Sequence, residues 1–487
     1  TSTITFSGGG QFVEFASNKT AAHVINFGTS SYRYGKWTVS GSAGNVVTLL
    51  GTNTAHIING PCTDGIDYLD IGTFRLSSTS GGEFYAGANS VATGTVVAPT
   101  YLTDKPADSV RYWIGAGGNW SNSTEWGETS GGAGGASVPR SHDDVVFDAN
   151  SSPTSYVATV TTITGGNRCK SLTISPPAAG TVTLAGSTSL YIHGNITLPA
   201  TGMTRSYTGP ITLSGEGAGK TLTTNGVTMS NLITVDAPLA EWALGSAFNN
   251  GSQSFNISSG SFDTAGYTFQ AGGINVFGNY TRSLSFGASL VTLTGTGLFL
   301  AAASSDFTTY NSNDTLTFDG GTAEIRITGA TGSLQAGGRT FHTVWFFAGT
   351  NKDLSGGSNT FTELKFSPNT TSNRYANFWI YNDQTITGTL TFNASGTAST
   401  RGALAAGQLS GAYKKSPVTL TCAAVSAPSD FDFQNIVIAG AAISGGNVTG
   451  TRLGDSGGNS GITFETPKTV YWNRAAGGAI NTSNSWA

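Results

Sequence analysis

The chain has 487 residues, a formal net charge of −4 and only 10% charged residues, whereas typical soluble domains are about 25% charged. This balance gives no electrostatic reason to expect nucleic-acid binding. The sequence contains no run of about 18 apolar residues, so we expect no membrane span.

The composition favours strands over helices. Glycine accounts for 68 residues, roughly twice its usual share of about 7%, and threonine and serine are also abundant. β-branched and aromatic residues favour strands, and glycine and asparagine serve tight turns. The three cysteines (Cys62, Cys169 and Cys422) form no CxxC pair, so neither a zinc site nor a disulfide framework is indicated. We therefore predict an all-β chain, and we expect no cofactor.

The first 100 residues alternate apolar and polar side chains without a helical period. Candidate strands lie at 37–40, 46–50 and 66–71. We interpret residues 1–100 as the C-terminal part of a preceding β-solenoid module. Prolines and polar residues then interrupt the pattern, so 101–110 is the best candidate for a linker.

A tryptophan- and glycine-rich motif occupies residues 111–150, and an imperfect second copy begins at 470. Tyr112-Trp113 matches Tyr471-Trp472, which lies 359 residues further on, and Trp126 matches Trp486. We interpret 111–150 as a cap or junction between modules and 470–487 as the start of the next module. Both ends of the chain then look cut from a longer polypeptide.

Between 151 and 469 the pattern is a long series of short alternating runs, including 171–174, 190–192, 290–294 and 324–328. Sandwiches need longer strands at regular spacing, and propellers need a blade period of about 40 to 50 residues. Very short strands with tight corners instead favour a β-solenoid, here a right-handed parallel β-helix. With roughly 22 residues per rung, 359 residues make about 16 rungs, a rod on the order of 75 Å long.

The motif that begins Tyr112-Trp113-x-Gly115-x-Gly117-Gly118-Asn119-Trp120, followed by the Thr/Leu alternation, resembles the repeated modules of large virion proteins of tailed bacteriophages. These are structural or tail-fibre-like proteins, and similar modules occur in bacterial surface adhesins. The resemblance implies a location on the virion surface or outside the cell. The partners it implies are other modules of the same long polypeptide and host-surface polysaccharide.

The leading functional hypothesis is a non-enzymatic structural module of a phage appendage, a tail fibre or surface fibre. It would form a stiff rod whose neutral Thr, Ser and Asn faces adhere to host glycans. A bacterial cell-surface adhesin is one alternative, and a tailspike-like polysaccharide depolymerase is another.

The three tryptophans of the motif, Trp113, Trp120 and Trp126, carry two hypotheses. Aromatic faces stack on sugar rings, so the cluster could form a glycan-binding platform. Large aromatic side chains more often bury their area in a core, and we favour a hydrophobic plug that caps the solenoid.

Two groups of acidic residues are candidates for chemistry. A glycosidase needs two carboxylates roughly 5 to 9.5 Å apart in a groove, and Asp314, Asp319 and Glu324 are close enough in sequence to be tested for it. Asp143, Asp144 and Asp148, together with Asn150, could offer oxygen ligands to Ca²⁺, although they lack the spacing of an EF-hand loop. Capping of turns is the commoner role for such aspartates, and we expect no metal site.

Overall fold

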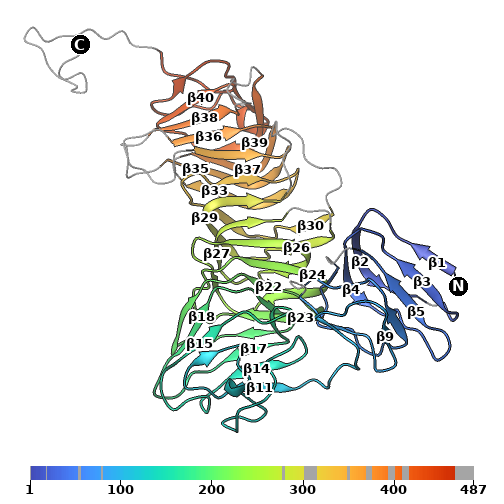
Figure 1. The fold of residues 1–487 in the computed structure, drawn as a ribbon. Coiled ribbons are helices and arrows are strands. Elements are labelled where there is room, and N and C mark those ends of the chain that lie inside the picture. Colours follow the sequence, from blue (N-terminus) through green and yellow to red (C-terminus); the bar gives the residue numbers. More distant parts are fainter. Residues whose placement is uncertain are drawn as a thin grey trace, which may run out of the picture.

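The computed structural model describes residues 2–466 except 18, 53–55, 78–80, 277–279, 301–314, 348–350, 369–375, 393–400 and 408–415. In this part of the chain nearly all regular structure is β-strand, and the two helices are single 3-10 turns, η1 (Ser123–Glu125) and η2 (Ala441–Ile443). Figure 1 shows a tall stack of strands with a smaller stack beside its lower half. The all-β prediction is confirmed.

The smaller stack is an N-terminal solenoid with three parallel sheets. The first sheet holds β1 (Ser2–Thr5), β3 (His23–Asn26), β5 (Val47–Leu50), β7 (Leu69–Ile71) and β9 (Val91–Ala92). The second holds β2 (Gly10–Phe15), β4 (Tyr32–Trp37) and β6 (Ile57–Ile58), and the third holds β8 (Phe84–Tyr85) and β10 (Thr100–Tyr101). These strands enclose their own aromatic core, which includes Phe27, Tyr34, Trp37 and Phe74.

The larger stack, the main solenoid, contains one sheet of 28 strands and one of four. The lower strands of the large sheet are β11 (Val110–Trp113), β13 (Trp126–Gly127), β14 (Asp144–Phe147), β16 (Asn167–Cys169), β17 (Leu172–Ile174), β19 (Leu190–Ile192), β20 (Ile196–Thr197), β22 (Ile211–Leu213), β23 (Glu216–Thr223), β24 (Ile233–Leu244), β25 (Phe248–Asn249), β26 (Ser254–Asp263), β27 (Phe269–Asn275) and β28 (Arg282–Ser285). The upper strands are β29 (Leu290–Phe299), β30 (Leu316–Asp319), β31 (Glu324–Ile327), β32 (Ser333–Gln335), β33 (Thr340–Phe347), β34 (Asn351–Ser355), β35 (Thr360–Ser367), β36 (Ala376–Ile380), β37 (Gln384–Phe392), β38 (Gly402–Ala406), β39 (Val418–Val425), β40 (Phe431–Gln434), β41 (Ile436–Ala439) and β42 (Gly454–Asp455). The four-stranded sheet holds β12 (Gly118–Asn119), β15 (Tyr156–Val160), β18 (Val182–Gly186) and β21 (Met203–Tyr207).

Each coil of the main solenoid lies on the one before it in parallel register. Val145 pairs with Leu172, 27 residues on, and Phe341 pairs with Phe361, 20 residues on. These spacings bracket the predicted coil length of roughly 22 residues, and the chain makes about 18 turns. The predicted β-solenoid is confirmed.

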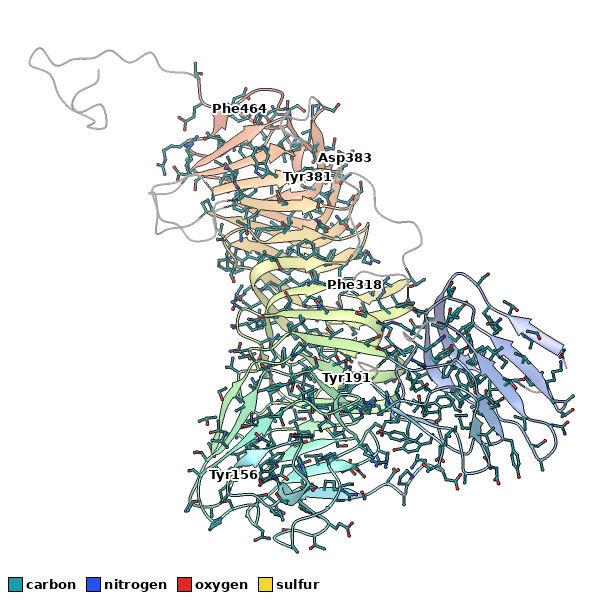
Figure 2. The ribbon with its side chains drawn as sticks, in the orientation of Figure 1. Tyr156, Tyr191, Phe318, Tyr381, Asp383 and Phe464 are labelled. Carbon is teal, nitrogen blue, oxygen red and sulfur yellow. The ribbon has the colours of Figure 1, made fainter. Side chains whose placement is uncertain are left out.

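The core follows directly from the alternation in the sequence. Strand β19 alternates buried, half-buried and buried side chains, so one face points inward and the other outward. One inward position is repeated through nine successive pairings that join ten residues: Leu190, Ile211, Ile233, Phe255, Ile274, Leu298, Leu334, Leu354, Ile380 and Ala406. All ten side chains are buried, and Figure 2 shows side chains filling the interior of both stacks.

Residues 102–109 separate the last strand of the N-terminal solenoid from the first strand of the main solenoid. The N-terminal solenoid ends with β10 at Tyr101, and the main solenoid begins with β11 at Val110. The 111–150 motif contributes β11, β13 and β14 to the main sheet, so it forms the first coil rather than a separate piece. The second copy at 470–487 lies outside the described residues.

Candidate functional site

The three tryptophans of the motif meet inside the first coil of the main solenoid. The ring centroids of Trp113 and Trp126 lie 5.1 Å apart, and those of Trp120 and Trp126 lie 4.9 Å apart, both with edge-to-face packing. Phe147 of β14 stacks on Trp113 at 5.4 Å. All three indoles are 0% exposed, so they form a hydrophobic plug at the end of the solenoid core. None of these three indole faces is open to a sugar.

The acidic residues of the motif serve local turns. Asp143 is buried, and its carboxylate accepts hydrogen bonds from the Arg140 backbone N–H at 2.9 Å and from the Ser109 hydroxyl. Asp148 accepts a hydrogen bond from the Asn150 backbone N–H at 2.9 Å, and Asp144 begins β14. In the part of the chain that the structure describes, no group of three or more His, Cys, Asp or Glu is arranged to hold a metal ion. The hypothesis of a Ca²⁺ site at these aspartates therefore gains no support.

Of the carboxylates considered for glycosidase chemistry, the two that the structure describes, Asp319 and Glu324, do not line the same groove. Asp319 ends β30 and caps a turn by accepting the Gly321 backbone N–H at 2.9 Å. It lines a surface groove together with Arg339 and His342, but Glu324 is not part of that lining. Glu324 instead forms an ion pair with Arg326, and Asp314 lies outside the described residues. The described geometry thus offers no two-carboxylate site at these positions.

The strongest concentration of buried charge lies where the N-terminal solenoid docks on the main solenoid. Glu83 comes from the N-terminal side, immediately before β8, and is 2% exposed. Its Oε2 accepts hydrogen bonds from the Ser141 hydroxyl at 2.6 Å and from the Ser141 backbone N–H at 3.2 Å. The Nδ1 atom of His142 lies 3.6 Å from the same oxygen. A carboxylate of the first solenoid is therefore held by the loop that leads into β14 of the second.

Arg168 and His193 of the main solenoid hold the backbone beside Glu83 through side-chain hydrogen bonds. The Arg168 guanidinium in β16 donates to the Gly82 carbonyl at 2.8 Å, and His193 Nε2 donates to the Gly81 carbonyl at 2.7 Å. Gly82 has to be glycine here, because a Cβ atom would lie 2.1 Å from the Gly60 carbonyl oxygen. We call Glu83, Ser141, His142, Arg168 and His193 the junction cluster.

Burial and neighbouring charges shift the titration of this cluster. Burial opposes ionisation of Glu83, but the His142 ring, the Arg168 charge and the Ser141 hydroxyl outweigh it and lower the pKa of Glu83 to about 2. Burial lowers the pKa of His193 to about 4, against the weaker opposing effect of its bond to Gly81. At neutral pH the junction therefore holds an ionised Glu83 and a neutral His193.

A second line of contacts runs along the flank of the main solenoid. Arg33 of β4 forms an ion pair with Asp236 of β24, and the Asn59 side chain donates to the Asp236 carbonyl at 3.2 Å. Below it, the Arg140 guanidinium donates to the Tyr85 hydroxyl at 3.1 Å and lies over the Tyr101 ring. The N-terminal solenoid is thus attached by specific polar contacts at several levels.

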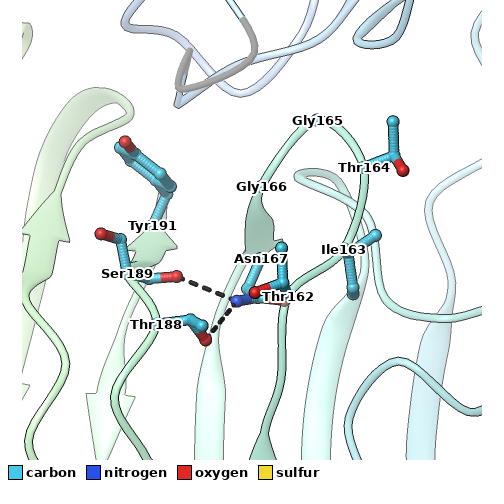
Figure 3. A pocket seen from close by; sticks show the side chains of 9 residues that line it. All are labelled: Thr162, Ile163, Thr164, Gly165, Gly166, Asn167, Thr188, Ser189 and Tyr191. Atoms are coloured by element: carbon cyan, nitrogen blue, oxygen red, sulfur yellow. Dashed lines mark hydrogen bonds between the residues drawn. The ribbon is translucent and has the colours of Figure 1, made fainter.

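Two pockets lie near this junction. One, of about 340 Å³, is lined by charges of both signs, including Asp64, Lys105, Lys170 and Glu216. The other is lined by residues 162–167, 188, 189 and 191, all of them uncharged. Figure 3 shows the Asn167 side-chain amide of that second pocket donating to the Thr188 hydroxyl and the Ser189 carbonyl.

Comparisons of the chain with protein-family models, with curated proteins and with solved structures found no match. No helix among the described residues has the length and apolar character needed to cross a membrane. The junction cluster is not predictable from the sequence, because Glu83 and Arg168 lie 85 positions apart without a motif around either. Only the Gly81-Gly82 pair marks a place of close backbone approach.

Proposed function

We propose that this chain is a structural module of a bacteriophage virion appendage, a tail fibre or surface fibre, and that it acts as a stiff rod without enzymatic activity. The observation that carries the proposal is the single 28-stranded sheet from β11 to β42, which surrounds one continuous core. In such a stack the backbone groups of each coil bond the coils above and below, which resists bending and proteolysis. The motif at 111–150 supports the assignment to a virion through its resemblance to tail-fibre-like modules.

The proposed mechanism is geometric. The N-terminal solenoid, interpreted as the end of a preceding module, docks on the flank of the main solenoid through the junction cluster. A joint fixed by buried polar contacts holds successive rods at a set angle, since each contact requires one register. The partners on this proposal are further modules of the same polypeptide, and the location is the virion surface.

Immunogold electron microscopy tests the assignment. Antibodies raised against the purified chain are applied to phage particles and to uninfected bacteria from the same source. Gold on a tail or surface projection is the expected result. Gold confined to the envelope of uninfected cells would overturn the virion assignment in favour of a bacterial adhesin.

A second experiment tests the non-enzymatic part of the proposal. The purified chain is incubated with polysaccharide from the host, and polymer size is followed by gel filtration. We expect the polymer to keep its length, and shortening would show depolymerase activity.

A further inference from the structure

A groove on the outer surface of the upper coils places a tryptophan beside carboxylate and amide side chains. It occupies about 210 Å³ and crosses the parallel strands β36, β38 and β40. Its lining includes Asn377, Trp379, Ala403, Ala405, Asp432 and Gln434. It lies far along the chain from the junction cluster, and the proposed rod does not require it.

Strand register explains why the groove is open. Trp379 pairs with Ala405 and Ala405 with Gln434, so one outward column reads tryptophan, alanine, glutamine. The neighbouring outward column reads Asn377, Ala403, Asp432. The small alanines of β38 leave a trough between two taller walls. Because adjacent strands are about 4.8 Å apart, the walls stand roughly 10 Å apart at the backbone.

The polar wall is held in place before any ligand arrives. Both Asp432 oxygens accept from Arg401 Nε at 2.9 Å, which neutralises the carboxylate and fixes its plane. Asn377 donates to Asn351 one coil below at 3.2 Å. The strands themselves are fixed by the buried Phe378, whose ring lies in the core beneath the groove. A preorganised wall loses little conformational entropy on binding.

We propose that this groove binds one neutral hexopyranose unit of a polysaccharide. The apolar C–H face of the sugar packs on the Trp379 indole, and the hydroxyls of its edge donate to Asp432 and bond the amides of Gln434 and Asn377. An aromatic face opposite carboxylate and amide groups matches a ring that is apolar on its faces and polar at its rim. The volume is below the 300 to 1,000 Å³ of drug-sized sites, which fits a single ring.

The charge balance selects a neutral sugar. Arg401 is already engaged by Asp432, so the groove offers no spare cation for a phosphate, sulfate or uronate group among its described lining residues. The identification of such a polysaccharide as a host-surface ligand rests on the proposed appendage function, but binding itself is measured independently of it.

Saturation-transfer NMR with the methyl glycosides of glucose, galactose and mannose tests the site on the purified full chain. Affinity electrophoresis through gels containing dextran, galactan or mannan gives a second readout. We expect at least one glycoside to show transfer and the matching polymer to retard the chain. Trp379→Ala should weaken retardation at least tenfold, and Ala405→Gln, which fills the trough without touching the core, should do the same.

Trp345→Ala is the matched control. This half-buried tryptophan lies on β33, in a different ladder of strands, between Arg326 and Lys365, and its removal should leave sugar binding unchanged. Should Trp379→Ala fail to fold by circular dichroism, Ala405→Gln decides the matter alone. Full retention of binding in Ala405→Gln, or binding only to uronic-acid polymers, would overturn the proposal. Neither result would alter immunogold labelling, so failure of the site and failure of the appendage assignment are distinguishable.

Discussion

Substitution of Glu83 by alanine should release the N-terminal solenoid from the main solenoid. The change removes two hydrogen bonds from Ser141 at 2.6 and 3.2 Å. It also leaves the Arg168 guanidinium, which is 3% exposed, without the buried negative charge beside it. Breaking a buried pair by removing one partner costs about 3–5 kcal/mol.

That free energy should act on docking rather than on global folding, because each solenoid has its own hydrophobic core. Undocking exposes Arg168 to water and so relieves the penalty. At about 1.4 kcal/mol per factor of ten, the docking equilibrium should shift by roughly 10² to 10³·⁵. The chain should open at the strand-free segment 102–109 between β10 and β11.

Small-angle X-ray scattering measures the release as an increase in maximum dimension, and limited proteolysis measures it as faster cleavage within 102–109. Glu14→Ala is the control, since Glu14 is a half-exposed carboxylate of the same solenoid, 3.9 Å from Lys36. The double variant Glu83→Ala/Arg168→Met should recover much of the docking, because it removes both buried charges. An unchanged scattering profile together with a lower melting temperature for the entire chain would refute the argument, since the junction would then be part of a single folding unit.

Three further outcomes follow from the same contacts. Trp126→Ala should destabilise the first coil by about 3–5 kcal/mol. Amide hydrogen exchange should become faster in β11 and β14 and stay unchanged in β40. Equal acceleration in all three strands would contradict a local role of Trp126 in the hydrophobic plug. Lowering the pH from 6.5 to 4 should weaken the fold by on the order of 3 kcal/mol through His193 alone, because this histidine, with its pKa of about 4, takes up a proton in the unfolded chain first. His56, whose pKa burial also lowers to about 4, adds to the decline. Glu83 stays ionised over this range, and an equally steep decline in melting temperature for His193→Gln would exclude His193 as the cause. Phe255 lies in the middle of the inward column, and Phe255→Ala should lower the free energy of unfolding by about 3–5 kcal/mol. Calorimetry should then show two separable melting transitions. One sharp transition would show that folding cooperativity extends across the cavity left by the phenylalanine ring.

The sequence predicted the solenoid well because its determinants are local. The run at 190–192 was expected to be a strand and forms β19 with alternating burial. The expected strand at 66–71 is shorter, since Tyr68 has a φ of 54° and the strand begins only at Leu69. The 12-residue β24 was not anticipated, because a strand that shifts register between Asp236 and Glu241 leaves no periodic signal.

The candidate sites were harder to predict because they depend on what distant coils bring together. The three tryptophans were recognised as a group, and the plug that we favoured agrees with their complete burial. Spacing alone suggested Asp314, Asp319 and Glu324 as a group, yet a two-glycine turn follows Asp319, and only Asp319 of the two described carboxylates lines the groove. The Trp379 groove depends on alanines one coil away, a relation that appears only once the register is known.

The contrast between the cores and the junction carries the argument for a rigid joint. Inside each solenoid, apolar columns tolerate small shifts, since one aliphatic contact replaces another at little cost. At the junction, Arg168 and His193 are nearly fully buried and each reaches one particular carbonyl. A shift of one coil, about 4.8 Å, would leave Glu83 and Arg168 desolvated without these partners, at a cost of several kcal/mol. A flank of exposed threonines alone would let the two rods slide, whereas the buried charges penalise every register except the observed one.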